Sequence, residues 1–221
     1  MNNEFQAVSQ SYPSTEVKNK VLRNTYALLA MTLLFSGVVA FISMSVNMPF
    51  INPIVYLIAA FGLLFAIEKT KNSSIGLVFT FLFTGFLGLA IGPVLNAYLS
   101  IPNGSEIVSS AFFTTAAAFL GLSMYTITTK KDFSFLSGFI VAGSIVLLVG
   151  IIAGIFLEIP MLQTAISIGM VLFSSALILW QTSAIVNGGE TNYISATVTL
   201  FVSIFNMFTS LLHLFGLSSD D

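Results

Sequence analysis

The fold is decided by residues 192–215, which read NYISATVTLFVSIFNMFTSLLHLF. Most of this stretch is apolar, but polar side chains recur in it at alternating spacings of three and four residues. At about 100° per residue, these side chains fall within an arc of roughly 80° on one helix. They are Asn192, Ser195, Thr199, Ser203, Asn206, Ser210 and His213. Because unpaired polar groups that face lipid are costly, we expect this helix to lie inside a bundle of membrane helices.

The composition is that of a membrane protein. The chain has 221 residues, of which 56% are hydrophobic and 7% are charged, whereas a soluble domain has about 25% charged residues. It contains one histidine and no cysteine, which excludes disulfides, thiolate metal sites and a cysteine nucleophile. The sequence has no zinc-protease motif, nucleophile elbow or phosphate-binding loop, and no pair of Asp residues within its spans. It therefore predicts no enzyme, no cofactor and no nucleic-acid partner.

Charged residues separate the predicted spans. Between residues 24 and 219, long intervals contain no Asp, Glu, Lys or Arg. A spanning helix needs about 20 apolar residues, so each interval holds one, except the first, which is long enough for two. Asn47, Pro49, Asn52 and Pro53 break that first interval. We therefore expect an all-α membrane protein with seven transmembrane helices, at about residues 25–46, 54–69, 75–98, 107–128, 134–157, 161–186 and 192–215.

The basic residues predict the orientation of the chain. All seven Lys and Arg residues fall on one side of the predicted membrane. By the positive-inside rule that side is cytoplasmic, so the N-terminus is expected inside and the C-terminus outside. Residues 1–20, rich in Asn, Ser and Gln, predict a flexible cytoplasmic tail rather than a signal peptide. Residues 21–217 are then the seven-helix domain, and residues 218–221 a short acidic periplasmic C-terminus.

Glycine and proline residues mark the expected helix contacts. Gly85, Gly88 and Gly92 in the third helix, like residues 150 and 154 in the fifth, have spacings that let neighbouring backbones approach closely. Pro93 lies inside the third helix and cannot donate a hydrogen bond to the carbonyl one turn earlier, so a kink is expected. Asn96 lies nearby in the sequence, and its side chain is expected to supply part of the hydrogen bonding that this carbonyl lacks.

The polar stripe on the last helix allows two interpretations. Its side chains form hydrogen bonds between helices, or they line a polar path through the bundle. His213 is either a packing residue or a group that titrates near neutral pH and gates such a path. Gln181 and Thr182, near the cytoplasmic end of the sixth helix, are the side chains expected to face the stripe.

The loop before the last helix also has a structural and a functional interpretation. Residues 187–193 read NGGETNY. The two glycines are expected to end one helix, and Thr191 or Asn192 to cap the next, with Glu190 near its positive end. The functional alternative is a contact site for a cytoplasmic partner. The residues proposed for that contact are Gly188, Gly189, Glu190, Asn192 and Tyr193.

Four separated motifs resemble the Bax-inhibitor family. They read KVLRNTY at residues 20–26, TGFLGLAIGPVLN at 84–96, KDFSFL at 131–136 and GGETNYI at 188–194. The resemblance extends from about residue 18 to residue 216. It implies a fold of seven helices in which the last helix is enclosed by the other six, in agreement with the argument from the polar stripe.

The resemblance also implies a partner. Within the family, the chain is most similar to bacterial inner-membrane proteins that modulate FtsH, an ATP-driven membrane protease. It is therefore expected to bind an FtsH-type protease and to restrain its degradation of membrane proteins. An ATP-driven unfolding motor can engage a flexible tail, whereas a tightly packed bundle resists extraction from the membrane.

An alternative function comes from other members of the same family. These resemble pH-sensitive calcium leaks that use paired Asp residues on the sixth and seventh helices. Alignment of the shared motifs places Gln181 and Ser203 at those two positions. Neither side chain can titrate or hold a negative charge, so the attraction for a divalent cation is absent there. A weaker or differently gated cation conductance stays open as the alternative.

Overall fold

The computed structural model describes residues 14–157 and 159–217, and every regular element in that part of the chain is helical. Seven of the helices are long and apolar enough to span a membrane, which confirms the predicted fold class. They are α1 (Thr15–Ser45), α2 (Pro53–Thr70), α3 (Ser74–Leu99), α4 (Gly104–Thr129), α5 (Ser137–Leu157), α6 (Pro160–Asn187) and α7 (Tyr193–Leu217). A short 3-10 turn, η1 (Ser134–Leu136), precedes α5.

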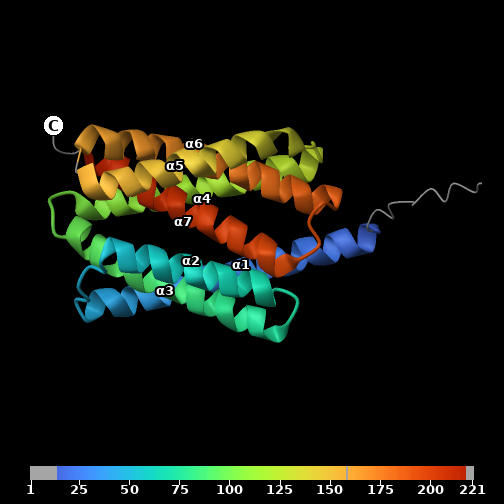
Figure 1. Cartoon of the computed structure of the whole chain (residues 1–221), viewed down its shortest axis with the longest axis horizontal. Coiled ribbons are helices and arrows are strands. Elements are labelled where there is room, and N and C mark those ends of the chain that lie inside the picture. The colour runs from blue at the N-terminus through green and yellow to red at the C-terminus, as the bar shows by residue number, and fades with distance from the viewer. Residues whose placement is uncertain (1–13, 158, 218–221) are drawn as a thin grey trace, which may run out of the picture.

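The last helix, α7, lies at the centre of the bundle. Figure 1 shows it between one layer formed by α1, α2 and α3 and another formed by α4, α5 and α6. Its main contacts are with α6, α4 and α1, and it also touches α3. Helix α2 packs chiefly on α3, and α5 on α6, so these two helices form the outer parts of their layers. The predicted central position of the last helix is confirmed.

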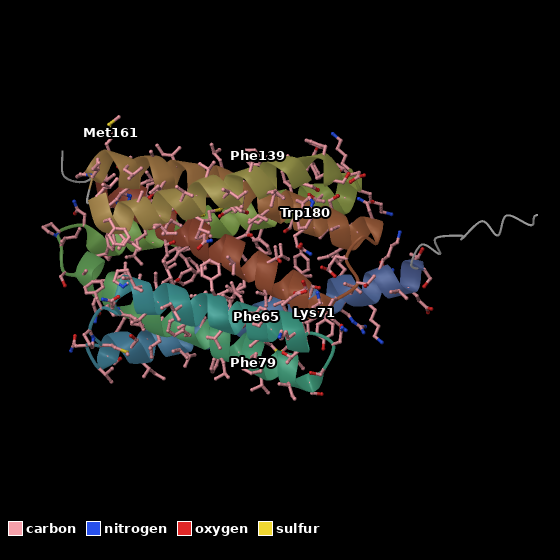
Figure 2. All side chains as sticks on the ribbon, viewed as in Figure 1. Phe65, Lys71, Phe79, Phe139, Met161 and Trp180 are labelled. Carbon is pink, nitrogen blue, oxygen red and sulfur yellow. The ribbon has the colours of Figure 1, made fainter. Side chains whose placement is uncertain are left out.

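The core is built around α7. Leu200, Phe201 and Met207 are almost completely buried, and the rings of Phe201 and Phe83, from α3, pack in an edge-on arrangement. Apolar side chains on the outer faces point away from the bundle, as Figure 2 shows for Met161. An apolar outer surface of this kind is expected of helices that face lipid.

Helix α1 begins earlier than the sequence suggested. It starts at Thr15, about ten residues before the predicted start at residue 25. The Ser14 hydroxyl accepts a hydrogen bond from the Val17 amide at 3.4 Å, and Glu16 lies in the first turn, where a negative charge is favourable. Residues 15–20, which were assigned to the tail, are therefore helical. The rest of the predicted tail, residues 1–13, and the C-terminal residues 218–221 lie outside the described residues.

The segments that carry Lys and Arg gather at one end of the bundle. They are the start of α1, the turn between α2 and α3, and the connection between α4 and α5. In Figure 1 this end lies at the right, together with the loop between α6 and α7. We call it the basic end, and the opposite end of the bundle the far end.

Glycine residues bring α1 and α3 into close contact, the most extensive between any two helices of the described chain. A Cβ atom on Gly88 would lie 2.3 Å from the backbone oxygen of Ser36, and one on Gly92 would lie 2.4 Å from the Ser43 hydroxyl. A Cβ atom on Gly85 would lie 2.8 Å from an aromatic ring of α1. The predicted packing role of these glycines is confirmed. We call this contact the α1–α3 seam.

The contact between α5 and α6 is looser. Cβ atoms on Gly150 and Gly154 would lie 3.3 and 3.6 Å from the side chain of Ile166 on α6. The second of these distances is ordinary van der Waals contact. Both glycines therefore pack against α6. A side chain would be tolerated better at these two positions than at the three glycines of α3.

The carbonyl group freed by Pro93 is satisfied from the neighbouring helix. Pro93 lies inside α3, and the carbonyl one turn earlier is that of Leu89. The Ser43 hydroxyl of α1 donates to this oxygen at 2.8 Å. The prediction for Asn96 was wrong, because its amide instead donates to the backbone oxygen of Met44, at the end of α1, at 3.0 Å. The sequence could not reveal Ser43 as the donor, since it lies 46 residues away from Leu89.

We expect Gly92→Ala to destabilise the bundle. The added methyl group would overlap the Ser43 side chain in the α1–α3 seam, and overpacking of this kind typically costs about 1–3 kcal/mol. The measurement is the midpoint of thermal unfolding in detergent micelles. The matched control is Gly62→Ala in α2, where a Cβ atom would have no neighbour within 4 Å. An unchanged midpoint for Gly92→Ala would show that the seam is not packed as described.

Candidate functional site

The polar stripe of α7 has a buried centre and half-exposed flanks. Ser203 is completely buried and Ser210 is 7% exposed, whereas Thr199, Asn206 and His213 are half-buried. The stripe therefore runs through the interior of the bundle for part of its length. This burial follows from the central position of α7 between the two layers.

Hydrogen bonds within α7 occupy the central hydroxyl groups. Thr199 donates to the backbone oxygen of Ser195 at 3.1 Å, and Ser203 donates to that of Thr199 at 2.8 Å. Towards the far end, His213 Nδ1 lies 3.1 Å from the Ser167 hydroxyl of α6. The expected bonding between helices is thus present at His213, but at Thr199 and Ser203 the hydroxyl protons are used within α7.

Two polar residues of α6 face the interior near the basic end. Thr182 pairs with the Tyr26 hydroxyl of α1 at 3.3 Å. Gln181 is 2% exposed, and its amide nitrogen has no hydrogen-bond partner within the described residues. Because neither Gln181 nor Ser203 can ionise, these two positions supply no fixed charge to the contact between α6 and α7.

The loop between α6 and α7 has a defined turn geometry. Gly188 ends α6 with a φ of 86°, a left-handed conformation that favours glycine. The Glu190 amide donates to the Ala184 oxygen at 3.0 Å, and the Glu190 carboxylate accepts from the Asn192 amide at 2.7 Å. The predicted helix stop at Gly188 is confirmed, and the carboxylate of Glu190 does lie at the start of α7.

Asn192 caps α7 and ties it to another loop. Its side-chain oxygen accepts from the Ile194 and Ser195 amides, both at 3.0 Å, which confirms the predicted cap. Its side-chain nitrogen donates to the backbone oxygen of Lys71 at 3.0 Å and to the Asn72 side chain at 2.8 Å. Asn192 therefore precedes α7 and joins the α6–α7 loop to the turn between α2 and α3.

A second set of hydrogen bonds joins α6 to the connection between α4 and α5. The Ser183 hydroxyl donates to the Lys131 oxygen at 3.0 Å and accepts from the Phe133 amide at 2.9 Å. The Asn187 side chain donates to Ser183 at 3.1 Å. Sequence analysis missed Ser183 as a linking residue, because a single serine in an apolar helix gives no indication of a partner 50 residues away.

The loops of the basic end therefore form one connected surface. Gly189 and Thr191 are exposed on it, whereas Tyr193 is half-buried and packs against the cluster of Val21, Ile185 and Ala196. Of the residues proposed for partner contact, Gly189 is thus the one that lies open, and Asn192 and Tyr193 hold the loop in place. No group of three His, Asp or Glu residues that could hold a metal ion lies within residues 14–157 and 159–217.

Comparisons with known proteins place the chain in a family. It matches the family described as Bax1-I, inhibitor of apoptosis-promoting Bax1, over residues 18–220. It is 56% identical, over 91% of its length, to an uncharacterised protein of Pseudomonas aeruginosa, of which 90% is covered. It is 47% identical, over 97% of its length, to the Escherichia coli K12 protein named modulator of FtsH protease YccA, of which 98% is covered. An uncharacterised membrane protein of Vibrio cholerae is 45% identical over the full length of both chains. The seven-helix chain described here therefore belongs to the Bax1-I family.

Proposed function

We propose that this protein binds an FtsH-type membrane protease and restrains the degradation of membrane proteins by it. The observation that carries the proposal is the 47% identity, over nearly the whole length of both chains, to the Escherichia coli modulator of FtsH protease. The protein acts in this proposal by binding rather than by catalysis. His213 of α7 does contact the Ser167 hydroxyl of α6, but neither helix supplies a charged third group to this pair, because no Asp, Glu, Lys or Arg lies in residues 159–189 or 191–219.

The proposed location is the bacterial inner membrane, with the N-terminus in the cytoplasm. One relative is named an inner membrane protein, and the seven spans support several crossings of the bilayer. The basic end carries the Lys and Arg residues, and the positive-inside rule assigns such an end to the cytoplasm. The loops joined through Ser183 and Asn192 then face the compartment in which a cytoplasmic domain of a partner would approach them.

The α1–α3 seam suggests how the protein would resist a protease that pulls from the N-terminus. Traction on the polar N-terminal segment reaches α1 first, and α1 makes its most extensive contact with α3. Removal of α1 would take Ser43 away from the Leu89 oxygen and leave that carbonyl unpaired in hydrocarbon, because Pro93 cannot bond to it. An unsatisfied group at this depth costs several kcal/mol. The seam thus opposes the first step of extraction.

Nothing in the described residues favours the alternative of a cation leak. Gln181 and Ser203, at the positions that would need charge, are neutral and almost completely buried. A conductive path through the stripe would need these groups to face water.

The proposed function is tested by reconstitution. We expect the degradation of a membrane substrate by purified FtsH in liposomes to slow in proportion to the amount of this protein added. Deletion of residues 2–13, which leaves the Ser14 cap of α1 in place, should restore the degradation rate if the N-terminal segment engages the protease. A rate that is the same with and without the protein would contradict the proposed function, and ion flux through the same liposomes would then be measured.

We expect Ser43→Ala to make the protein itself a better substrate of the protease. The substitution removes the donor to the Leu89 oxygen and so weakens the α1–α3 seam. The measurement is the rate at which full-length protein disappears in the reconstituted system, compared with Ser45→Ala. Ser45 is a suitable control because, among the described residues, its hydroxyl bonds only to the Phe41 backbone oxygen of its own helix, at 2.8 Å. Equal rates for the two variants would contradict a role for the seam in resisting extraction.

We expect Gly189→Arg to reduce co-purification of the protein with FtsH several-fold. Gly189 is exposed on the basic end, and a Cβ atom there would lie 3.7 Å from its nearest neighbour, the backbone oxygen of Ala184. The variant should therefore fold normally while a bulky charge blocks the surface. The matched control is Ser105→Arg, an exposed position at the far end. Equal recovery of FtsH with both variants would place the contact elsewhere.

A further inference from the structure

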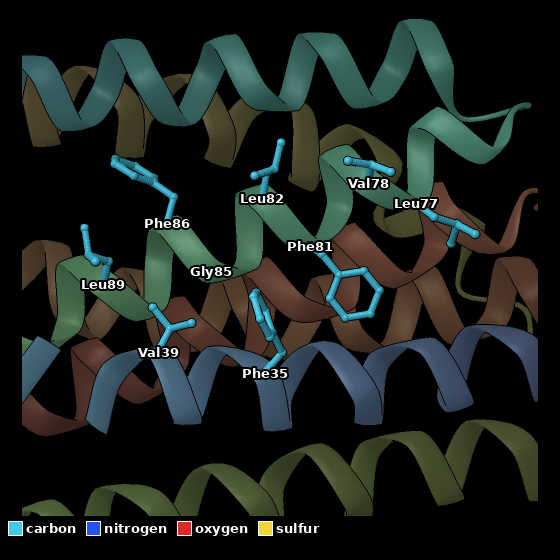
Figure 3. Close-up of a pocket in the computed structure, with 9 residues that line it drawn as sticks. All are labelled: Phe35, Val39, Leu77, Val78, Phe81, Leu82, Gly85, Phe86 and Leu89. Carbon is cyan, nitrogen blue, oxygen red and sulfur yellow. The ribbon is translucent and has the colours of Figure 1, made fainter. Parts of the chain in front are cut away.

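An apolar groove runs along the outer side of the α1–α3 seam. Its volume is about 580 Å³, and Figure 3 shows the nine residues that line it. Two come from α1, among them Phe35, and the others come from α3, from Leu77 near the basic end to Leu89. The floor includes Gly85, and the exposed side chains of Val78 and Leu82 stand at its rim. The groove is therefore open towards the surroundings of the bundle and offers almost only carbon atoms.

Only one end of this groove adjoins a segment with basic residues, namely the end of α2 and the turn after it, which carry Lys69 and Lys71. Leu77 follows Gly76, whose Cβ position lies 3.1 Å from the Cα atom of Lys71, so the groove begins beside the turn between α2 and α3. The Lys71 ammonium pairs with Glu68. The neighbouring Lys69 is exposed, lies over an aromatic ring of its own helix, and has no carboxylate partner among the described residues.

The start of α3 adds to this positive potential. Ser73, the residue before α3, forms no side-chain cap, because its hydroxyl donates to the Thr70 oxygen at 2.9 Å. The amides in the first turn of α3 therefore have no side-chain acceptor. The positive end of the helix dipole lies at these same amides. At the other end of the groove there is no comparable charge, since no Asp, Glu, Lys or Arg lies between residues 72 and 105.

We propose that this groove binds an anionic phospholipid. One acyl chain lies along α3 between Leu77 and Leu89, and the phosphate group lies at the basic end, near Lys69 and the start of α3. The charge distribution of the groove matches such a molecule, which is negatively charged at one end and apolar along its length. Basic groups next to helices at the cytoplasmic side of a membrane attract anionic headgroups in this way, and phosphate groups bind at helix N-termini.

The arrangement fits a lipid better than a second protein helix. A helix would need polar or small side chains along its path to fix its position, and the only small residue of the groove, Gly85, is already approached by the Phe35 ring. A lipid needs only an apolar wall and a charge at the end. The bound chain would cover the outer side of the α1–α3 seam and protect it.

The proposal is tested by native mass spectrometry of the full-length protein. The protein is equilibrated with vesicles of phosphatidylglycerol and phosphatidylcholine in equal amounts and then released from detergent in the spectrometer. We expect at least a fivefold preference for retained phosphatidylglycerol, and a loss of most of that preference in Lys69→Gln. Lys130→Gln, at the basic end but on the connection after α4, is the matched control and should keep the preference.

Variants with a filled groove test the position of the acyl chain. Val78→Trp with Leu82→Trp places two large side chains at exposed rim positions, so folding should be retained while lipid retention falls about fivefold. Val38→Trp with Phe41→Trp, equally exposed on α1 but outside the groove, should change nothing. Equal retention of the two lipids, or an equal loss with the control pair, would overturn the proposal.

Cross-linking distinguishes a lipid from a protein occupant. Because the chain contains no cysteine, Leu82→Cys introduces a single thiol at the rim of the groove. In bacterial membranes we expect no efficient disulfide-linked dimer and no efficient cross-link to another protein. Efficient formation of a dimer would identify a second copy as the occupant, and an efficient cross-link to FtsH would identify a helix of the protease. Either result would overturn the proposed lipid site.

Discussion

The structure depends on the hydrogen bond from the Ser43 hydroxyl to the Leu89 oxygen. A bilayer has no water for a backbone carbonyl that lacks its helical partner, and Pro93 creates such a carbonyl in the middle of a span. The bond requires α1 and α3 to lie almost in backbone contact, which Gly88 and Gly92 permit. A local disruption in one helix is thus compensated by a neighbour, and this requirement fixes how the two helices fit together.

The fold was largely predictable from the sequence. Charge-free intervals gave the number and approximate bounds of the spans, because ionised groups are excluded from hydrocarbon. The stripe from Ser195 to His213 predicted the central position of α7, since polar groups must avoid lipid. The start of α1 was missed, because the polar residues after Ser14 resemble a tail, although a helix can continue beyond the membrane into water.

The candidate site was less predictable, and the reason is physical. Caps such as Asn192 and the left-handed Gly188 depend on neighbouring residues and were recognised. The partners of Ser43 and Ser183 are 46 and 50 residues away, and no periodicity shows which helices will be neighbours. The same limitation applies to Thr199 and Ser203, whose hydroxyls bond along their own helix instead of across the bundle.

The parallel pairing of α1 with α3 has a consequence for biogenesis. The two helices are separated in the chain by α2, so α1 and α2 emerge from the ribosome before α3. During that interval the side of α1 that carries Ser36 and Ser43 has no glycine surface to pack on. Only the arrival of α3 closes this side, and α7, the centre of the finished bundle, is synthesised last. The order of membrane insertion therefore differs from the order of burial, and the nascent protein must persist for most of its synthesis without its core helix.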